Sequence, residues 1–196
     1  MRKIVQAIGF ITLFTALGAV SCKENPKADT KDSRVEQFFN YENRADTCWN
    51  AMMYSDDSKI ENMKRLIKEL QLIEGSDEAQ LSRLLNRIDS LRLIRYDRLG
   101  VKNSSLIDQY DNQTNVVLSE VRKLVTANPN ASKYQLINQL SSEISLADDS
   151  VLFYRKDYDK ALDSIRYFKT KHGKALKKQI PNLDSLGNFP QFRLVQ

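Results

Sequence analysis

The stretch that decides the fold is SKYQLINQLSSEISLADDSVLFYRKDYDKALDSIRYFKTKH, residues 132–172. Apolar or small side chains recur along it in alternating steps of three and four residues: Ile137, Leu140, Ile144, Ala147, Val151, Tyr154, Tyr158, Ala161, Ile165 and Phe168. This heptad spacing predicts one helix that presents a narrow stripe to partner helices along its whole length. Such a helix would be about 60 Å long, so we expect the other segments to lie along it.

The remainder of the chain has the same helical character. Six Gly and four Pro in 196 residues leave few breakers, and no run of alternating polarity is long enough for a sheet. The periodicity predicts helices over residues 33–54, 56–74, 77–99 and 104–128, ahead of the long one. Ser55, Asp56 and Asp57 favour a break between the first two, because Ser and Asp cap helix N-termini. The expected fold class is all-α, an elongated antiparallel bundle of four to five helices.

The N-terminus has the layout of a lipoprotein signal peptide. Arg2 and Lys3 precede a mostly apolar segment, and residues 19–21 (AVS) lead directly into Cys22. We expect residues 1–21 to be removed and Cys22 to carry fatty acids such as palmitate, which would anchor the chain to a membrane. The alternative is an uncleaved anchor helix, because about 17 apolar residues is the lower limit for spanning a bilayer.

This interpretation divides the chain into four parts. Residues 1–21 are the signal peptide, and residues 22–32 are a charged segment without large apolar side chains, expected to be a disordered tether. Residues 33–172 form the bundle, and residues 173–196 form an irregular tail. The apolar side chains of the tail are Leu183, Leu186, Phe189, Phe192 and Leu194. Because these are too many for a free segment, we expect the tail to fold back onto the bundle or to bind a partner.

Residues 127–168 resemble the C-terminal half of the LemA family of membrane-anchored helical proteins. That family has a short turn with a Pro and then a long helix, which carries an aromatic and Leu-Gln start and an Arg before paired Tyr-Asn dipeptides. The matching residues here are Asn128, Pro129, Tyr134, Gln135, Leu136, Leu140, Arg155 and Tyr158, while Asp159 stands in place of the first Asn. A fainter similarity covers residues 41–46 (YENRAD). The resemblance implies a helical fold and an anchored location, and it implies no reaction.

Residues that usually carry catalysis or bind metals are sparse. His172 is the only His, which excludes a His-containing triad and a multi-His metal site; we expect it on the surface at a helix end. Cys48 has no neighbouring base and is expected to be structural. A run of carboxylates on the long helix alternates with basic side chains, which is typical of a solvated helix face. The run comprises Asp148, Asp149, Asp157, Asp159 and Asp163. The sequence therefore predicts a protein that is not an enzyme and has no cofactor.

Charge indicates one candidate contact surface. The chain has 30 basic and 25 acidic residues, a balance too even for a nucleic-acid binder, which must neutralise many phosphates. A local basic patch comprises Lys169, Lys171, Lys174, Lys177 and Lys178. This patch is either a solvated helix end or, with Phe189 and Phe192 of the tail, a contact with an anionic membrane or a partner. The choice depends on which end of the bundle faces the lipid.

Two functions of different classes fit these features. The first is a lipid-anchored protein of the bacterial cell envelope, on the outer membrane if the cell has two membranes. Its domain would lie in the periplasm or at the surface and act by contact with an unknown envelope protein. The second is a bundle that binds a small ligand, which would be recognised by several polar groups converging on one cavity between helices. A rod-like spacer is a third option.

Overall fold

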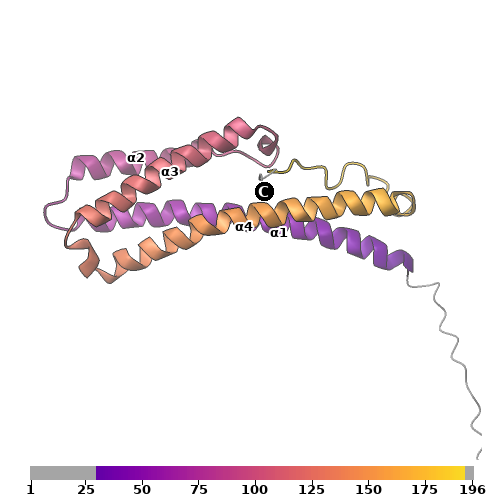
Figure 1. The fold of residues 1–196 in the computed structure, drawn as a ribbon, viewed down its shortest axis with the longest axis horizontal. Helices are drawn as coiled ribbons and strands as arrows, with labels where there is room; N and C mark the ends of the chain where they lie inside the picture. Colours follow the sequence, from indigo (N-terminus) through magenta and orange to yellow (C-terminus); the bar gives the residue numbers. More distant parts are fainter. Residues whose placement is uncertain (1–29, 193–196) are drawn as a thin grey trace, which may run out of the picture.

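The computed structural model describes residues 30–192, which contain four α-helices and no strand (Figure 1). The helices are α1 (Thr30–Gln71), α2 (Glu78–Ile94), α3 (Ser104–Ala127) and α4 (Gln135–Leu176), with short 3₁₀ turns at η1 (Gly100–Lys102) and η2 (Ala131–Lys133). The all-α prediction is confirmed. Cys22 and the expected signal peptide lie outside the described residues. Within residues 30–192, no helix combines the length and apolar character that crossing a bilayer requires.

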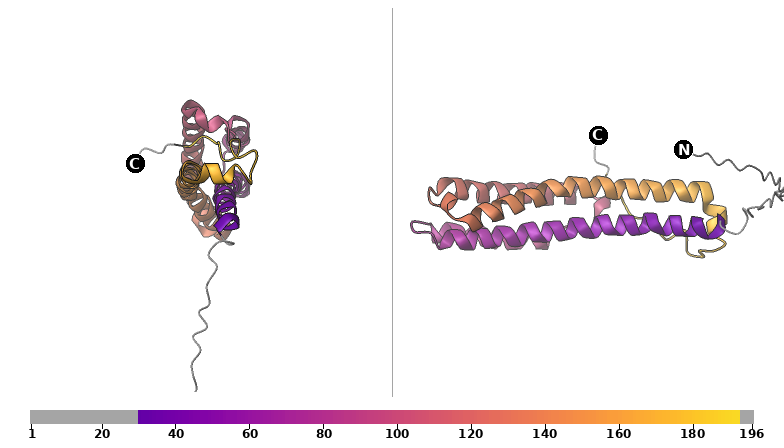
Figure 2. Two further views of the ribbon diagram at one scale, coloured as in Figure 1. Left: turned by 90° about the vertical axis from the view of Figure 1, so that its right-hand side faces the viewer. Right: turned by 90° about the horizontal axis from the view of Figure 1, so that it is seen from below.

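α1 and α4 form an antiparallel pair that runs the length of the molecule (Figure 2). Each helix has 42 residues, which corresponds to about 60 Å. Ring contacts fix the register of the pair: the centroids of Tyr41 and Phe168 lie 5.7 Å apart, and those of Trp49 and Tyr158 lie 5.8 Å apart. The α2–α3 hairpin covers one half of this pair, and the chain after α4 runs back along the other half (Figure 1).

α1 does not break at residues 55–57, so that prediction is wrong. Ser55 and Asp56 are buried within a continuous helix. The Ser55 hydroxyl donates to the Ala147 carbonyl of α4 at 3.2 Å, and the Lys59 ammonium lies 3.2 Å from the Asp56 carboxylate. Groups on the next turn and on the neighbouring helix therefore satisfy the side chains that would otherwise favour a new helix N-terminus.

The ends of two helices, α2 and α4, also differ from the prediction. α2 ends at Ile94, and the loop that follows turns Tyr96 into the core, where it is 6 % exposed. α4 begins at Gln135 rather than at residue 132, because residues 131–133 form η2, and it continues past His172 to Leu176. The long helix is thus shifted towards the C-terminus by a few residues.

The heptad stripe of α4 is buried at both ends and loose in the middle. Its buried members are Ile137, Leu140, Ile144, Tyr158, Ala161, Ile165 and Phe168. Ala147, Val151 and Tyr154 are only half-buried, whereas Arg155, which lies outside the stripe, is 4 % exposed. The hydrophobic core is therefore interrupted by a buried charge near the middle of α4.

The tail folds back onto the bundle, as its apolar composition predicted. Its side chains Ile180, Leu183 and Phe192 are buried. Gly187 has a φ of +61°, and a Cβ at this position would lie 2.5 Å from the Ile165 side chain of α4. The backbone of the tail therefore lies directly against the helix, at a distance that only glycine permits.

Two carboxylates of the acidic run on α4 also hold the tail. Asp159 accepts a hydrogen bond from the Phe192 amide at 2.9 Å. Asp163 accepts one from the Gln191 side chain at 2.7 Å. The acidic run on α4 thus has a structural role in its C-terminal part, where it fixes the end of the described chain.

Candidate functional site

The predicted basic patch lies at the end of the molecule where α1 begins. Near the C-terminus of α4, the His172 ring lies 4.6 Å from that of Phe168, which in turn contacts Tyr41 of α1. Arg34, in the second turn of α1, is close enough to His172 for its charge to add to the effect of desolvation and lower the pKa of that imidazole. The start of α1 and the end of α4 therefore share one end of the bundle (Figure 2).

Three of the five lysines in the patch are exposed and make no ion pair within the described part of the chain. These are Lys171, Lys174 and Lys178. Lys177 pairs with Asp184 at 2.8 Å. Lys169 donates to the Leu186 carbonyl of the tail, and burial lowers the pKa of its ammonium. The free part of the patch is thus a group of three lysines at the tip of the bundle.

Phe189 and Phe192 do not lie where a membrane or partner could reach both of them. Phe192 is 9 % exposed and packs on the rings of Trp49 and Tyr96. Phe189 is half-buried, with the Arg98 guanidinium 3.6 Å from its ring centroid. Both phenylalanines join the tail to the bundle, so the contact role predicted for them does not fit this arrangement.

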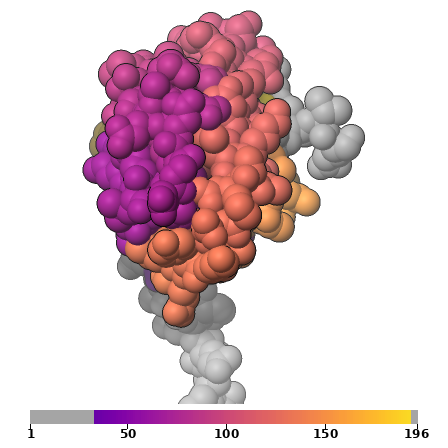
Figure 3. Space-filling model, turned by 90° about the vertical axis from the view of Figure 1, so that its left-hand side faces the viewer, coloured from indigo at the N-terminus to yellow at the C-terminus, as the bar shows by residue number. Residues whose placement is uncertain are grey.

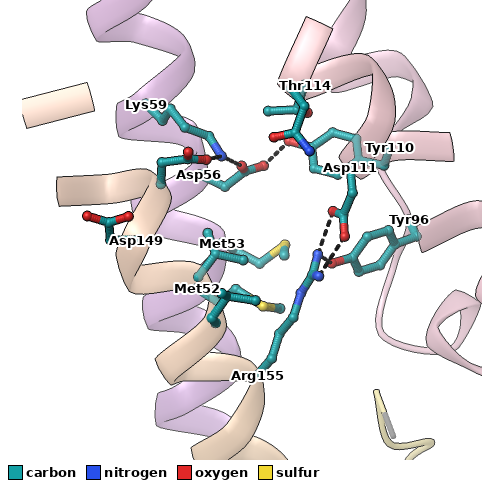
Figure 4. Close-up of a pocket in the computed structure, with 14 residues that line it drawn as sticks. Met52, Met53, Asp56, Lys59, Tyr96, Tyr110, Asp111, Thr114, Asp149 and Arg155 are labelled. Carbon is teal, nitrogen blue, oxygen red and sulfur yellow. Dashed lines mark hydrogen bonds and ion pairs between the residues drawn. The ribbon is translucent and has the colours of Figure 1, made fainter. Parts of the chain in front are cut away.

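A polar cavity of ≈ 220 Å³ lies between α1, α3 and α4, where the heptad stripe of α4 loosens (Figure 4). Its charged lining residues are Asp56, Lys59, Asp111, Asp148, Asp149 and Arg155. Less polar side chains also line it: Met52, Met53, Tyr96 and Tyr110. These side chains come from three helices and the loop after α2, so no single stretch of sequence contains the site.

Asp56, on the α1 side of the cavity, is neutralised from several directions. Lys59 lies 3.2 Å from one carboxylate oxygen, and Arg95 lies 3.3 Å from the other. The Tyr110 hydroxyl of α3 donates a short hydrogen bond to the same carboxylate (Figure 4). Burial and then the charge of Asp56 raise the pKa of Tyr110. Because Lys59 also contacts Asp148 at 3.2 Å, this network ties α1 to α3 and α4.

Arg155 crosses the cavity from α4 to α3. Its two terminal nitrogens each donate to Asp111 at 2.7 Å, and Nη2 also donates to the Tyr96 hydroxyl at 2.7 Å (Figure 4). Burial disfavours the charge of Arg155, but the hydrogen bonds to Asp111 outweigh it and raise the pKa of the guanidinium. Burial also raises the pKa of Tyr96 to about 12. The Arg155 guanidinium is therefore charged at neutral pH, and the Tyr96 phenol keeps its proton.

Two polar atoms of the lining residues are buried without a hydrogen-bond partner: Thr114 Oγ1 and Arg155 Nε. Thr114 Oγ1 is near enough to Tyr110 to affect its pKa, but the two hydroxyls do not meet in ordinary hydrogen-bond geometry. Buried polar atoms are paired in most proteins, and an orphan calls for an explanation such as a ligand or water. The cavity therefore has unused hydrogen-bonding capacity.

The groups around the cavity are suited to holding a polar molecule by charge and hydrogen bonds. Within the described residues, no three His, Cys, Asp or Glu side chains are grouped so that they could hold a metal ion. Cys48 is half-buried elsewhere on α1, where burial raises the pKa of its thiol. Tyr96 and Tyr110 keep their protons at neutral pH and can donate or accept hydrogen bonds without acting as bases.

The sequence interpretation did not locate this cavity. It placed Asp148 and Asp149 on a solvated face, but the Asp148 side chain is 27 % exposed and contacts the buried Lys59. It assigned Asp56 to a helix break. The available signal was the Asp56–Lys59 pair at i, i+3 within an otherwise apolar helix face, which indicates an ion pair inside a continuous helix.

No protein-family model, curated protein sequence or solved structure matches the chain.

Proposed function

We propose that the protein is a lipid-anchored, LemA-like component of the bacterial cell envelope that acts by contact rather than by catalysis. In this proposal Cys22 carries the acyl chains, and the bundle meets the membrane with its basic end. The observation that supports it is the location of Lys171, Lys174 and Lys178 at the end of the bundle where α1 begins. The opposite end, seen in Figure 3, is then free to meet an envelope partner.

The reach of the N-terminal segment is consistent with this orientation. Eight residue steps separate Cys22 from Thr30, the first residue of α1. Even a fully extended chain of this length spans at most about 28 Å. An anchor at Cys22 would therefore keep the basic end close to the lipid headgroups. Each lysine near an anionic surface contributes roughly 1 kcal/mol of attraction.

Two measurements test this function. Radiolabelled palmitate should enter the wild-type chain and not the Cys22→Ala variant; equal labelling would refute the anchor. Lysine acetylation followed by mass spectrometry, on the whole chain in lipid nanodiscs, tests the orientation. Lys171, Lys174 and Lys178 should react more slowly when the nanodisc contains phosphatidylglycerol than when it contains only phosphatidylcholine.

The chain supplies its own controls for the acetylation experiment. Lys68 and Lys123 are exposed near the opposite end of the bundle, so their reactivity should not depend on the lipid. Added salt should restore the reactivity of the three lysines, because it screens charge attraction at an exposed surface. If none of the five lysines changes its reactivity between the two lipids, the proposed orientation is contradicted.

A second function is favoured by the polar cavity: the bundle binds a small ligand. Several polar groups from three helices converge there, and Thr114 Oγ1 and Arg155 Nε have no partner. This function is compatible with the first, since the cavity lies between the helices and away from the basic end.

A further inference from the structure

A second cavity lies beside the polar one, one helical turn further along α3 and α4. Its volume is ≈ 310 Å³. The two linings adjoin by one helical turn on each helix: Leu118 follows Thr114 on α3, and Ile144 precedes Asp148 on α4. The groove between α3 and α4 stays open because α3 packs mainly on α2 and makes few contacts with α4. We call the two adjoining cavities the α3–α4 groove.

The two halves of the α3–α4 groove differ in chemistry. The second cavity is lined by the cation Arg122, by the apolar side chains Leu66, Leu118, Val121, Val125 and Ile144, and by three small hydroxyl residues. One of these, Ser141, already donates its proton to the Ile137 carbonyl at 2.8 Å. The first cavity carries six charged side chains. A molecule that fills both halves therefore needs an apolar chain and a polar head.

The charges of the first cavity decide the sign of the head. Its lining has four carboxylates and two cations, and both cations already contact carboxylates: Lys59 meets Asp56 and Asp148, and Arg155 meets Asp111. An incoming anion would thus have to compete with carboxylates for these cations.

Asp149 is exposed and makes no ion pair within the part of the chain that the structure describes. Arg122, whose side chain is 57 % exposed, reaches Asp148 only at 3.8 Å from the edge of the second cavity. Arg95 adds a cation at Asp56 but does not line the cavity. The carboxylate that these cations leave without an ion pair at this end of the groove is therefore that of Asp149; Thr114 Oγ1 adds an unused acceptor and Arg155 Nε an unused donor.

We propose that the α3–α4 groove binds a small organic cation that carries an apolar chain. Its ammonium group lies against Asp148 and Asp149 in the polar half, and its chain lies along Leu118, Val121 and Ile144 in the apolar half. This inference rests on the ligand-binding function proposed above and is independent of the lipid anchor.

Calorimetric titration of the whole chain in phosphatidylcholine nanodiscs with hexylammonium chloride tests the proposal, with empty nanodiscs as the blank for partitioning. Saturable binding to one site is expected. Hexanol, which lacks the charge, should bind at least about fivefold more weakly, and hexanoate should not bind. Ethylammonium, which lacks most of the apolar chain, should bind at least roughly tenfold more weakly.

Matched variants locate the site. Asp149→Asn should weaken hexylammonium about fivefold, whereas Asp108→Asn, at an exposed position of α3 outside the groove, should not. Ser145→Phe should fill the apolar half and abolish binding, whereas Ser142→Phe, on the exposed side of α4, should not. If Ser145→Phe fails to fold, the Asp149→Asn comparison still decides the matter.

Each other outcome has a definite meaning. Equal affinity for hexanol and hexylammonium, or tighter binding of hexanoate, would overturn the assigned ligand class and leave ligand binding as such intact. Binding that neither Asp149→Asn nor Ser145→Phe changes would place the ligand outside the α3–α4 groove and refute the proposal. If none of the probes binds, the ligand-binding function fails with it, whereas the palmitate and acetylation experiments remain unaffected.

Discussion

At the scale of single residues, the Arg155–Asp111 pair is asymmetric. The Arg155 side chain is 5 % exposed, whereas that of Asp111 is 36 % exposed. Water can therefore hydrate Asp111 if its partner is removed, but it cannot hydrate Arg155 to the same extent. Removing one partner of a buried ion pair is costly chiefly because the other charge is left behind.

We therefore predict that Asp111→Ala destabilises the protein more than Arg155→Met. The first change strands a buried guanidinium and should cost about 3–5 kcal/mol, whereas the second leaves a solvated carboxylate and an apolar chain of similar length and should cost about 1–2 kcal/mol. Urea denaturation followed by circular dichroism measures both. Equal costs, or a larger cost for Arg155→Met, would contradict the asymmetry.

The buried tyrosines make the folded protein less stable at alkaline pH. The pKa of Tyr96 rises from 10.0 to about 12 in the folded protein, so above pH 10 the unfolded chain loses this proton while the folded chain keeps it. The contribution of Tyr96 to the free energy of unfolding is then complete below pH 10 and decreases as the pH rises towards 12. A shift of this size corresponds to about 2–3 kcal/mol.

The Tyr96→Phe variant should lose about 2–3 kcal/mol less stability than the wild type between pH 10 and about pH 12. At neutral pH it should be slightly less stable, because the hydrogen bond from Arg155 is gone. Denaturant titrations at several pH values measure the difference. The same pH slope in both proteins would show that Tyr96 does not titrate differently in the folded and unfolded states.

At the scale of elements, hydrophobic periodicity was a good guide to α3 and α4, and apolar composition was a good guide to the return of the tail. It misplaced the break in α1, because Ser55 and Asp56 are capping residues by local rules and become interior residues only when α4 and Lys59 satisfy them. It also missed the cavity. Arg155 lies outside the heptad stripe, and its burial depends on Asp111 and Tyr96, which are 44 and 59 residues away in the chain.

The tail gives a prediction at this scale, with a control on the helix before it. Gly187→Ala should loosen the tail at a cost of about 2–3 kcal/mol, because its φ is +61° and the new Cβ would meet Ile165 at 2.5 Å. A Cβ added at Gly173 in α4 would meet no other atom within 4 Å, so Gly173→Ala should stabilise the helix by about 0.5–1 kcal/mol.

Trp49, the only Trp of the chain, reports on the tail because its ring stacks on Phe192 with centroids 6.3 Å apart. Its fluorescence should shift to the red in Gly187→Ala and stay unchanged in Gly173→Ala. An unshifted spectrum together with unchanged stability in Gly187→Ala would mean that the tail is not held in the way described.

At the scale of the whole molecule, the α1–α4 pair separates two ends by about 60 Å. Three free lysines lie at one end, and the loops that join α1 to α2 and α3 to α4 lie at the other (Figure 3). If the basic end sits on an anionic bilayer, the molecule stands away from the membrane and its loops are far from the lipid. If the lysines contribute nothing, the anchor at Cys22 still keeps this end near the lipid, but no attraction favours an upright bundle over one that lies flat.

Energy transfer from a fluorophore to a dye in the lipid headgroups distinguishes these cases in the anchored chain. In a Cys48→Ala background, a label at Gln179→Cys, near the basic end, should transfer strongly, and a label at Leu72→Cys, an exposed position after α1, should transfer weakly. Exchanging Lys171, Lys174 and Lys178 for Glu should raise transfer from position 72, because repulsion from anionic lipid would replace about 3 kcal/mol of attraction and tilt the bundle. Equal transfer from both labels before the exchange would mean that the bundle lies flat, and the contact surface would then have to be sought along its side.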